Sequence, residues 1–112
     1  MDVATPATRQ YDNHIGGERV PPADGRRFES INPTTGEVWG RFAESGRADV
    51  DRAVRAARAA FEGPWGKLSP TRKGRLMMAW GERIAENAEA IAAMETQQNG
   101  KLIAEMRAQA NV

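Results

Sequence analysis

The hydrophobic pattern of this chain changes once along its length, from the alternation of a β-strand to the periodicity of an α-helix. In residues 38–43 the side chains alternate between two faces, as they do on a half-exposed strand. In residues 50–61 the apolar side chains recur at intervals of three and four, as they do on an amphipathic helix. We therefore predict a chain of the α/β class, with a small N-terminal hairpin or sheet followed by three to four α-helices.

Turn residues divide the first part into three predicted strands. The first lies between Tyr11 and Val20 and bends at Gly16-Gly17, and residues 27–31 form the second. Asn32-Pro33-Thr34-Thr35-Gly36 then turns the chain into the third strand. On that strand we expect Val38, Gly40 and Phe42 to share one face, and Trp39, Arg41 and Ala43 the other. Residues 1–10 are small and polar and are predicted to be a disordered tail.

Helix signals dominate the second part. The stripe of the first helix consists of Val50, Ala53, Val54, Ala57, Ala60 and Phe61. Ser69-Pro70 should open the second helix, with Ser as the cap and Pro in the first turn. Leu76, Trp80 and Ile84 form its stripe, which Met77 widens. A third helix should begin at Asn87 and end at Asn99-Gly100, and residues 101–110 should be helical again.

Composition excludes several classes of function. Sixteen basic and fifteen acidic residues give a net charge of +1, so no global field attracts nucleic acid or an anionic membrane. The chain has no cysteine, which excludes disulfides and thiolate chemistry within it and is consistent with a cytoplasmic location. We expect neither a membrane span, since the apolar runs are far shorter than about 20 residues, nor a secretory signal in the first ten residues.

The candidate catalytic and binding patterns favour structural interpretations. Neither the dinucleotide fingerprint nor the phosphate-binding loop occurs, because the required glycine spacing is missing. His14 is the only imidazole and has no second metal ligand, so we interpret it as an exposed strand residue. Three acidic residues, Glu82, Glu86 and Glu89, are interpreted as a solvated helix face. The basic residues Arg52, Arg55, Arg58, Arg72, Lys73 and Arg75 could bind phosphates, although nearby glutamates favour an ordinary surface.

The order of these segments resembles the N-terminal part of the aldehyde dehydrogenase superfamily. The resemblance covers about residues 11–110. It is carried, in chain order, by Ile15-Gly16-Gly17-Glu18, residues 31–38, Asp49-Val50-Asp51-Arg52-Ala53-Val54 with Ala57, Ala60 and Phe61, then Trp65, Arg72, Leu76, Ile84, Glu95-Thr96 and Asn99-Gly100-Lys101. Residues 11–112 are accordingly expected to be an incomplete aldehyde dehydrogenase domain, similar to the start of the Rossmann-like cofactor domain.

The resemblance implies a function for the complete family protein. Such enzymes oxidise an aldehyde to a carboxylic acid with NAD or NADP, using a cysteine nucleophile and a glutamate-activated water. We expect those groups, and the cofactor loop, to lie beyond Val112, so that this chain alone is inactive and binds no cofactor. Some members hold a cation with a strand carbonyl and a carboxylate, and the matching positions here are Ile31 and Gln98. Gln98 offers a neutral amide in place of the carboxylate, which weakens its attraction for a cation.

Three functional hypotheses remain open at this point. The first is an N-terminal segment of an NAD(P)-dependent aldehyde dehydrogenase, with the remainder of the fold as its partner and, as is usual in the family, a homo-oligomeric assembly. The second is a non-catalytic helical interaction module, or gene remnant, that docks on a full-length relative. The third is nucleic-acid binding through the Arg-rich helices, which we rank last because of the balanced charge.

Overall fold

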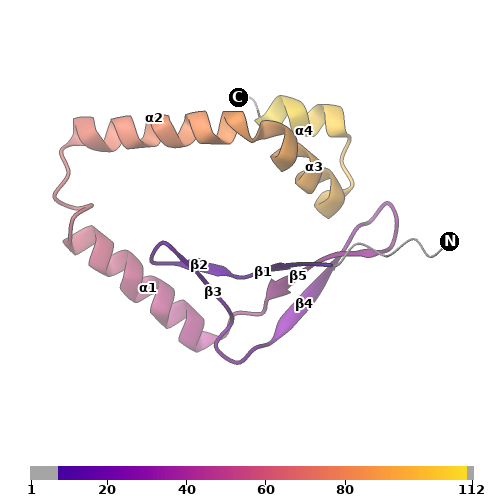
Figure 1. Ribbon diagram of the computed structural model, residues 1–112, viewed down its shortest axis with the longest axis horizontal. Helices are drawn as coiled ribbons and strands as arrows, with labels where there is room; N and C mark the ends of the chain where they lie inside the picture. The colour runs from indigo at the N-terminus through magenta and orange to yellow at the C-terminus, as the bar shows by residue number, and fades with distance from the viewer. Residues whose placement is uncertain (1–7, 111–112) are drawn as a thin grey trace. The chain divides into compact units, whose positions relative to one another are not determined.

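The chain divides into two compact units, Met1–Ala56 and Ala57–Val112, and the computed structural model describes residues 8–110 of it (Figure 1). The first unit contains five strands and the start of helix α1, Arg47–Glu62. The second contains the end of α1 and three further helices: α2 is Pro70–Glu86, α3 is Ala88–Asn99 and α4 is Ile103–Ala110. The predicted order, a small sheet followed by helices, is confirmed.

A three-stranded mixed sheet forms the centre of the first unit, in the order β1-β5-β4. Its strands are β1, Arg9–Tyr11; β4, Arg27–Ile31; and β5, Val38–Ala43. β4 runs antiparallel to β5, whereas β1 runs parallel to it, with Tyr11 opposite Phe42. The limits predicted for β4 and β5 are therefore correct. The predicted tail is too long, because Arg9 and Gln10 belong to β1; residues 1–7 of that tail lie outside the described part.

A separate hairpin replaces the single bent strand predicted between Tyr11 and Val20. Its strands are β2, Asn13–Ile15, and β3, Glu18–Val20, and they pair antiparallel across Gly16-Gly17. Both glycines have positive φ, 63° and 87°, as a two-residue type I′ turn requires. The chain therefore reverses at this point, and Ile15 and Val20 are buried.

Aromatic rings line one face of the three-stranded sheet. Phe42 stacks on Tyr11 of β1 at 4.7 Å between ring centroids and on Phe28 of β4 at 5.7 Å. The pairing changes register between Ser30 and Ile31, so that Ile31 is opposite Val38 and Ser30 is opposite Gly40. This bulge leaves Trp39 as the extra residue of β5. The predicted alternation is wrong at Trp39, whose ring lies 5.3 Å from that of Phe42 although we expected opposite faces.

Arg27 connects β4 to the chain that follows β1. Its guanidinium donates to the carbonyl oxygen of Tyr11 at 3.2 Å and pairs with the carboxylate of Asp12. A second cross-strand ion pair joins Arg41 to Glu29, at 2.7 Å. Aromatic contacts and ion pairs therefore stabilise the sheet.

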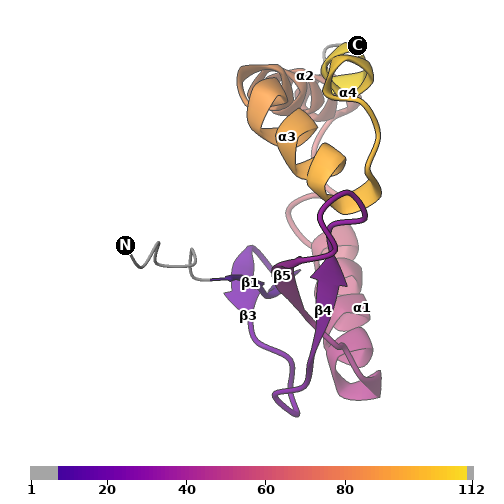
Figure 2. The same ribbon diagram turned by 90° about the vertical axis from the view of Figure 1, so that its right-hand side faces the viewer.

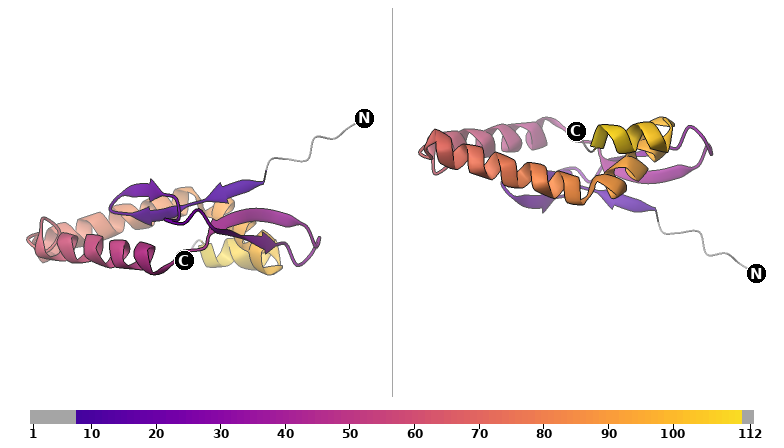
Figure 3. Two further views of the ribbon diagram at one scale, coloured as in Figure 1. Left: turned by 90° about the horizontal axis from the view of Figure 1, so that it is seen from below. Right: turned by 90° about the horizontal axis from the view of Figure 1, so that it is seen from above.

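Local signals explain where α2 begins. The hydroxyl oxygen of Ser69 accepts a hydrogen bond from the backbone N–H of Arg72, and Pro70 occupies the first turn, as predicted. Before it, the chain folds back on the end of α1 at Gly66, where a Cβ would lie 1.7 Å from the carbonyl oxygen of Phe61. Only glycine fits this close approach. Figure 3 shows α2 as one continuous helix.

The core of the second unit lies between α3 and α4, which pack against each other (Figure 2). Ala88, Ala92 and Met106 are buried there. Gly100, with φ of 74°, ends α3 in the left-handed conformation that the sequence predicted. Helix α2 contributes no buried residue.

Candidate functional site

The two candidate cation ligands fall in different units. Ile31 is the last residue of β4, and its side chain is exposed. Gln98 lies in the last turn of α3, and it too is exposed. Among residues 8–110, no group of three or more His, Asp or Glu side chains is placed to hold a metal ion. The cation site therefore stays a prediction from the resemblance alone.

The turn after Ile31 has a well-defined geometry. The carboxamide oxygen of Asn32 accepts from the backbone N–H of Thr34 at 2.9 Å, and its carbonyl oxygen accepts from the N–H of Gly36 at 2.8 Å. The N–H of Asn32 in turn donates to the carbonyl oxygen of Glu37, at 2.9 Å. These bonds satisfy the backbone of the turn and fix the direction in which the chain enters β5.

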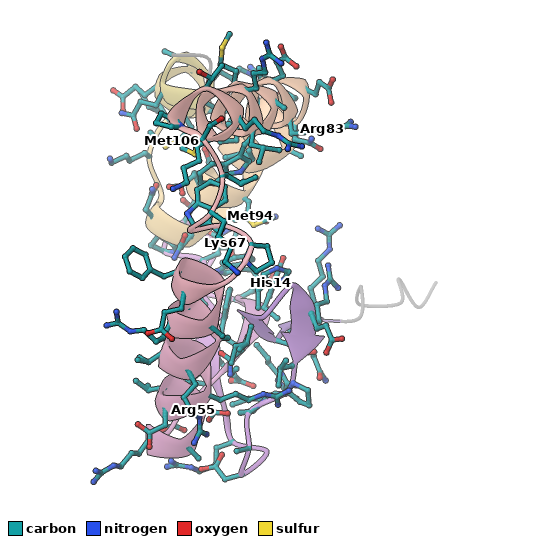
Figure 4. All side chains as sticks on the ribbon, turned by 90° about the vertical axis from the view of Figure 1, so that its left-hand side faces the viewer. His14, Arg55, Lys67, Arg83, Met94 and Met106 are labelled. Carbon is teal, nitrogen blue, oxygen red and sulfur yellow. The ribbon has the colours of Figure 1, made fainter. Side chains whose placement is uncertain are left out.

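His14 lies on β2 opposite Arg19, and its side chain is exposed (Figure 4). The interpretation of His14 as an exposed strand residue is confirmed. The three glutamates of the acidic row are also exposed. Glu86 pairs with Arg83 at 2.9 Å, and Glu89 receives three hydrogen bonds from Arg107 across the α3–α4 contact. The hydrogen bonds from Arg107 hold the pKa of Glu89 below its usual range. The three glutamates therefore form a solvated surface, on which Glu86 and Glu89 make ion pairs.

The basic residues are divided between two helices. On α1, the guanidinium of Arg58 lies 5.8 Å from the ring centre of Phe61. At α2, the ammonium of Lys73 lies 5.6 Å from the ring centre of Trp65. These contacts place both cations against aromatic faces of their own unit. Arg72 and Arg75 line a shallow, open hollow together with Leu68 and Leu76.

Asp49 has a larger role than the sequence indicated. It lies in the first turn of α1, where the helix dipole favours an acidic residue, and it is only 5% exposed. One carboxylate oxygen accepts from the N–H of Gly46 at 2.9 Å, and the other accepts from the N–H of Ala23 at 3.0 Å. The first bond resembles the reciprocal bond of a capping box, which the three-residue spacing could have indicated. The second ties the loop after β3 to α1.

Two exposed apolar stripes are the most distinctive surfaces of the described chain. The α1 stripe is Val50, Ala53, Val54, Ala57, Ala60 and Phe61, and the α2 stripe is Leu76, Met77, Trp80 and Ile84. Phe61 is 65% exposed and Trp80 is 61% exposed. Burial of such a side chain contributes about 1.5–3 kcal/mol, so exposed stripes of this kind mark surfaces suited to docking. No described helix is long and apolar enough to cross a membrane.

The family model for the aldehyde dehydrogenase family matches residues 20–112. The chain belongs to the aldehyde dehydrogenase family. It is 40% identical over 108 residues to acetaldehyde dehydrogenase 2 of Cupriavidus necator, covering 96% of this chain and 21% of that protein. It is 42% identical to an aldehyde dehydrogenase of Paracoccus denitrificans over 105 residues, 94% of this chain and 20% of that protein.

Solved aldehyde dehydrogenases share the fold. An NAD-dependent aldehyde dehydrogenase from Sinorhizobium meliloti matches with a TM-score of 0.88 and 34% identity, over 98% of this chain and 23% of that one. A Bacillus cereus enzyme in complex with NAD+ matches with a TM-score of 0.83 and 35% identity, over 86% of this chain and 20% of that one. This aldehyde dehydrogenase chain therefore spans about a fifth of the length of the relatives it matches. Its fold is that of their N-terminal part.

Proposed function

We propose that this chain supplies the N-terminal segment of an NAD(P)-dependent aldehyde dehydrogenase, which oxidises an aldehyde to a carboxylic acid in the cytoplasm. The family match and its restriction to a fifth of the relatives' length support this assignment. The chain contains no cysteine, the residue that the resemblance makes the nucleophile. In this proposal the segment supports the fold, while the catalytic and cofactor-binding groups belong to other parts of the enzyme.

The exposure of the α1 and α2 stripes is the observation that carries the structural role. Both helices have the apolar periodicity of elements that cover a core, yet Val54, Phe61 and Trp80 are each 60% exposed or more. We infer that the remainder of the dehydrogenase fold buries these stripes, and that NAD or NADP binds to that remainder.

The same stripes also favour an interaction module that docks on a full-length relative. The two functions differ in whether this chain is covalently joined to the rest of the dehydrogenase fold. A segment of the enzyme restores activity when it is fused to the missing part, whereas a docking module co-purifies with a relative that is already complete. Purifying a tagged form of this chain in the presence of a full-length relative tests the second function directly.

A chimera tests the first function. The N-terminal fifth of the Cupriavidus necator relative is replaced by this chain, and the reduction of NAD+ by acetaldehyde is measured. We expect a soluble, active chimera, and no reduction by the 112-residue chain alone. Turnover by the chain alone would contradict the placement of the chemistry outside it.

Two matched substitutions in the chimera test the stripe itself. Trp80→Gln removes a ring from the α2 stripe, whereas Met78→Gln alters a side chain that is 71% exposed and lies off the stripe. We expect Trp80→Gln to lower the free energy of unfolding of the chimera by more than about 1.4 kcal/mol, a factor of about ten in its unfolding equilibrium constant, since the mutation removes a buried aromatic ring. Met78→Gln should have little effect. Equal losses would show that the α2 stripe is not the buried surface.

A further inference from the structure

Asn99 is the one asparagine in the chain that is followed by glycine; the other four precede His, Pro, Ala and Val. This dipeptide is chemically special, because the backbone nitrogen of the following residue can attack the asparagine carboxamide. Glycine has no side chain to obstruct that approach and gives the backbone the freedom to reach it. In an unfolded chain, Asn99 is therefore the asparagine most prone to deamidation.

In the folded chain the groups that would react are held apart by hydrogen bonds. The carboxamide nitrogen of Asn99 donates to a carboxylate oxygen of Glu95 at 3.1 Å, and its oxygen accepts from the N–H of Lys101 at 2.8 Å. The attacking group, the N–H of Gly100, donates to the carbonyl oxygen of Thr96 at 2.9 Å and so closes the last turn of α3. Ring closure requires the carboxamide to turn and Gly100 to leave the helix end.

We propose that Asn99 is a latent deamidation site that the folded end of α3 keeps unreactive. When the helix end opens, the nitrogen of Gly100 loses its proton and bonds to Cγ of Asn99. The bond from Cγ to Nδ2 breaks, and the amide leaves with that proton as ammonia. Water then opens the resulting five-membered imide at either carbonyl, which gives aspartate or isoaspartate at position 99.

Deamidation would damage the helix end that prevents it. The product carries a negative charge beside Glu95 and lacks the N–H groups that Asn99 donated to it. Like charges one helical turn apart are destabilising, and the carboxylate lies at the negative end of the helix dipole. The modification therefore makes further opening of α3 easier.

The rate of deamidation in the folded and unfolded chain tests the proposal. The 112-residue chain is incubated at mildly alkaline pH in buffer, in guanidinium chloride and in sodium chloride of equal concentration. Tryptic peptide 84–101, which contains both Asn87 and Asn99, is then analysed by fragment mass spectrometry. Because the hydrogen bonds of Asn99 and Gly100 must break, we expect modification of Asn99 to be at least roughly tenfold slower in buffer and in sodium chloride than in guanidinium chloride.

The N–H of Lys101 could instead polarise the carboxamide and assist attack. That effect would make the folded chain react as fast as the unfolded chain, or faster. Equal or faster reaction in buffer therefore overturns the proposal.

Two variants of Glu95 separate its hydrogen bond from its charge. Glu95→Gln keeps an oxygen that can accept from Asn99, whereas Glu95→Ala removes it while favouring the helix. In buffer we expect Glu95→Ala to react several-fold faster than the parent, and Glu95→Gln to stay close to the parent. Glu105→Ala, at an exposed position on α4, is the control. In guanidinium chloride all four chains should react alike, and an unchanged rate for Glu95→Ala in buffer would contradict the role of this contact.

Discussion

The sheet of the first unit and the helix α2 of the second use their aromatic residues in opposite ways. In the sheet, the ring of Phe42 contacts the rings of Tyr11 and Phe28 on the two neighbouring strands and the ring of Trp39 on its own strand. On α2, Trp80 is 61% exposed, and the helix buries nothing. Both elements have a clear hydrophobic pattern. Such a pattern therefore predicts which face of an element is apolar, but not what covers that face.

The largest expected effect on the free energy of unfolding comes from replacing a packed aromatic ring by alanine, with the same substitution of an exposed ring as the comparison. Phe42→Ala removes the centre of the aromatic row, and we expect it to reduce the free energy of unfolding by about 2–3 kcal/mol. Phe61→Ala, on the α1 stripe, should change it by less than about 0.5 kcal/mol. Guanidinium unfolding of the whole chain, followed by circular dichroism, measures both. Similar losses for the two variants would show that the α1 stripe is covered in the isolated chain.

Asp49 provides the next test, because it joins a loop to a helix within the sheet unit. Asp49→Ala leaves the N–H groups of Ala23 and Gly46 without their acceptor, and we expect a loss of about 2 kcal/mol. Asp49→Asn keeps one acceptor oxygen and should lose about half as much. Asp51→Ala, an exposed acidic residue on the same helix, should be nearly neutral. If Asp49→Ala and Asp51→Ala both had the same thermal unfolding curve as the parent, the hydrogen bonds of Asp49 would not stabilise the chain.

The sequence predicts an element correctly where that element depends on interactions between residues close together in the chain. Strands β4 and β5, the cap at Ser69-Pro70 and the stop at Asn99-Gly100 were predicted correctly, because each depends on residues close together in the chain. Strand β1 was missed, since three residues carry no pattern and the strand exists only through its pairing with β5. The bulge at Trp39 was missed for the same reason, because it is a property of the paired strands.

The candidate site shows a similar division. The exposed state of His14 and of the acidic row followed from the sequence, because His14 has no second metal ligand and the glutamates lie opposite an apolar helix face. The contact between Asp49 and Ala23 did not, because 26 residues separate them. Ile31 and Gln98 were candidate cation ligands through the family resemblance alone, because nothing in the sequence around either residue indicates a cation site.

The smallest expected effect concerns the α3–α4 contact, where the second unit has a core of its own. Arg107 lowers the pKa of Glu89 in the folded chain, so the folded state binds the proton of this carboxyl less readily than the unfolded state. The stabilisation is therefore complete above the ordinary glutamate pKa of 4.5 and is lost as the pH falls through the lower, folded-state value.

Glu89→Gln should remove this acid-side loss while leaving the rest of the pH dependence intact. Glu82→Gln, an exposed glutamate on α2, is the matched control and should follow the parent. Midpoint temperatures from circular dichroism between neutral pH and about pH 3 would record the difference. Because the pair is exposed, added salt should reduce it. If Glu89→Gln and Glu82→Gln gave the same curve, α3 and α4 would be held together by the packing of Ala88, Ala92 and Met106 alone, and the ion pair would be a consequence of that packing.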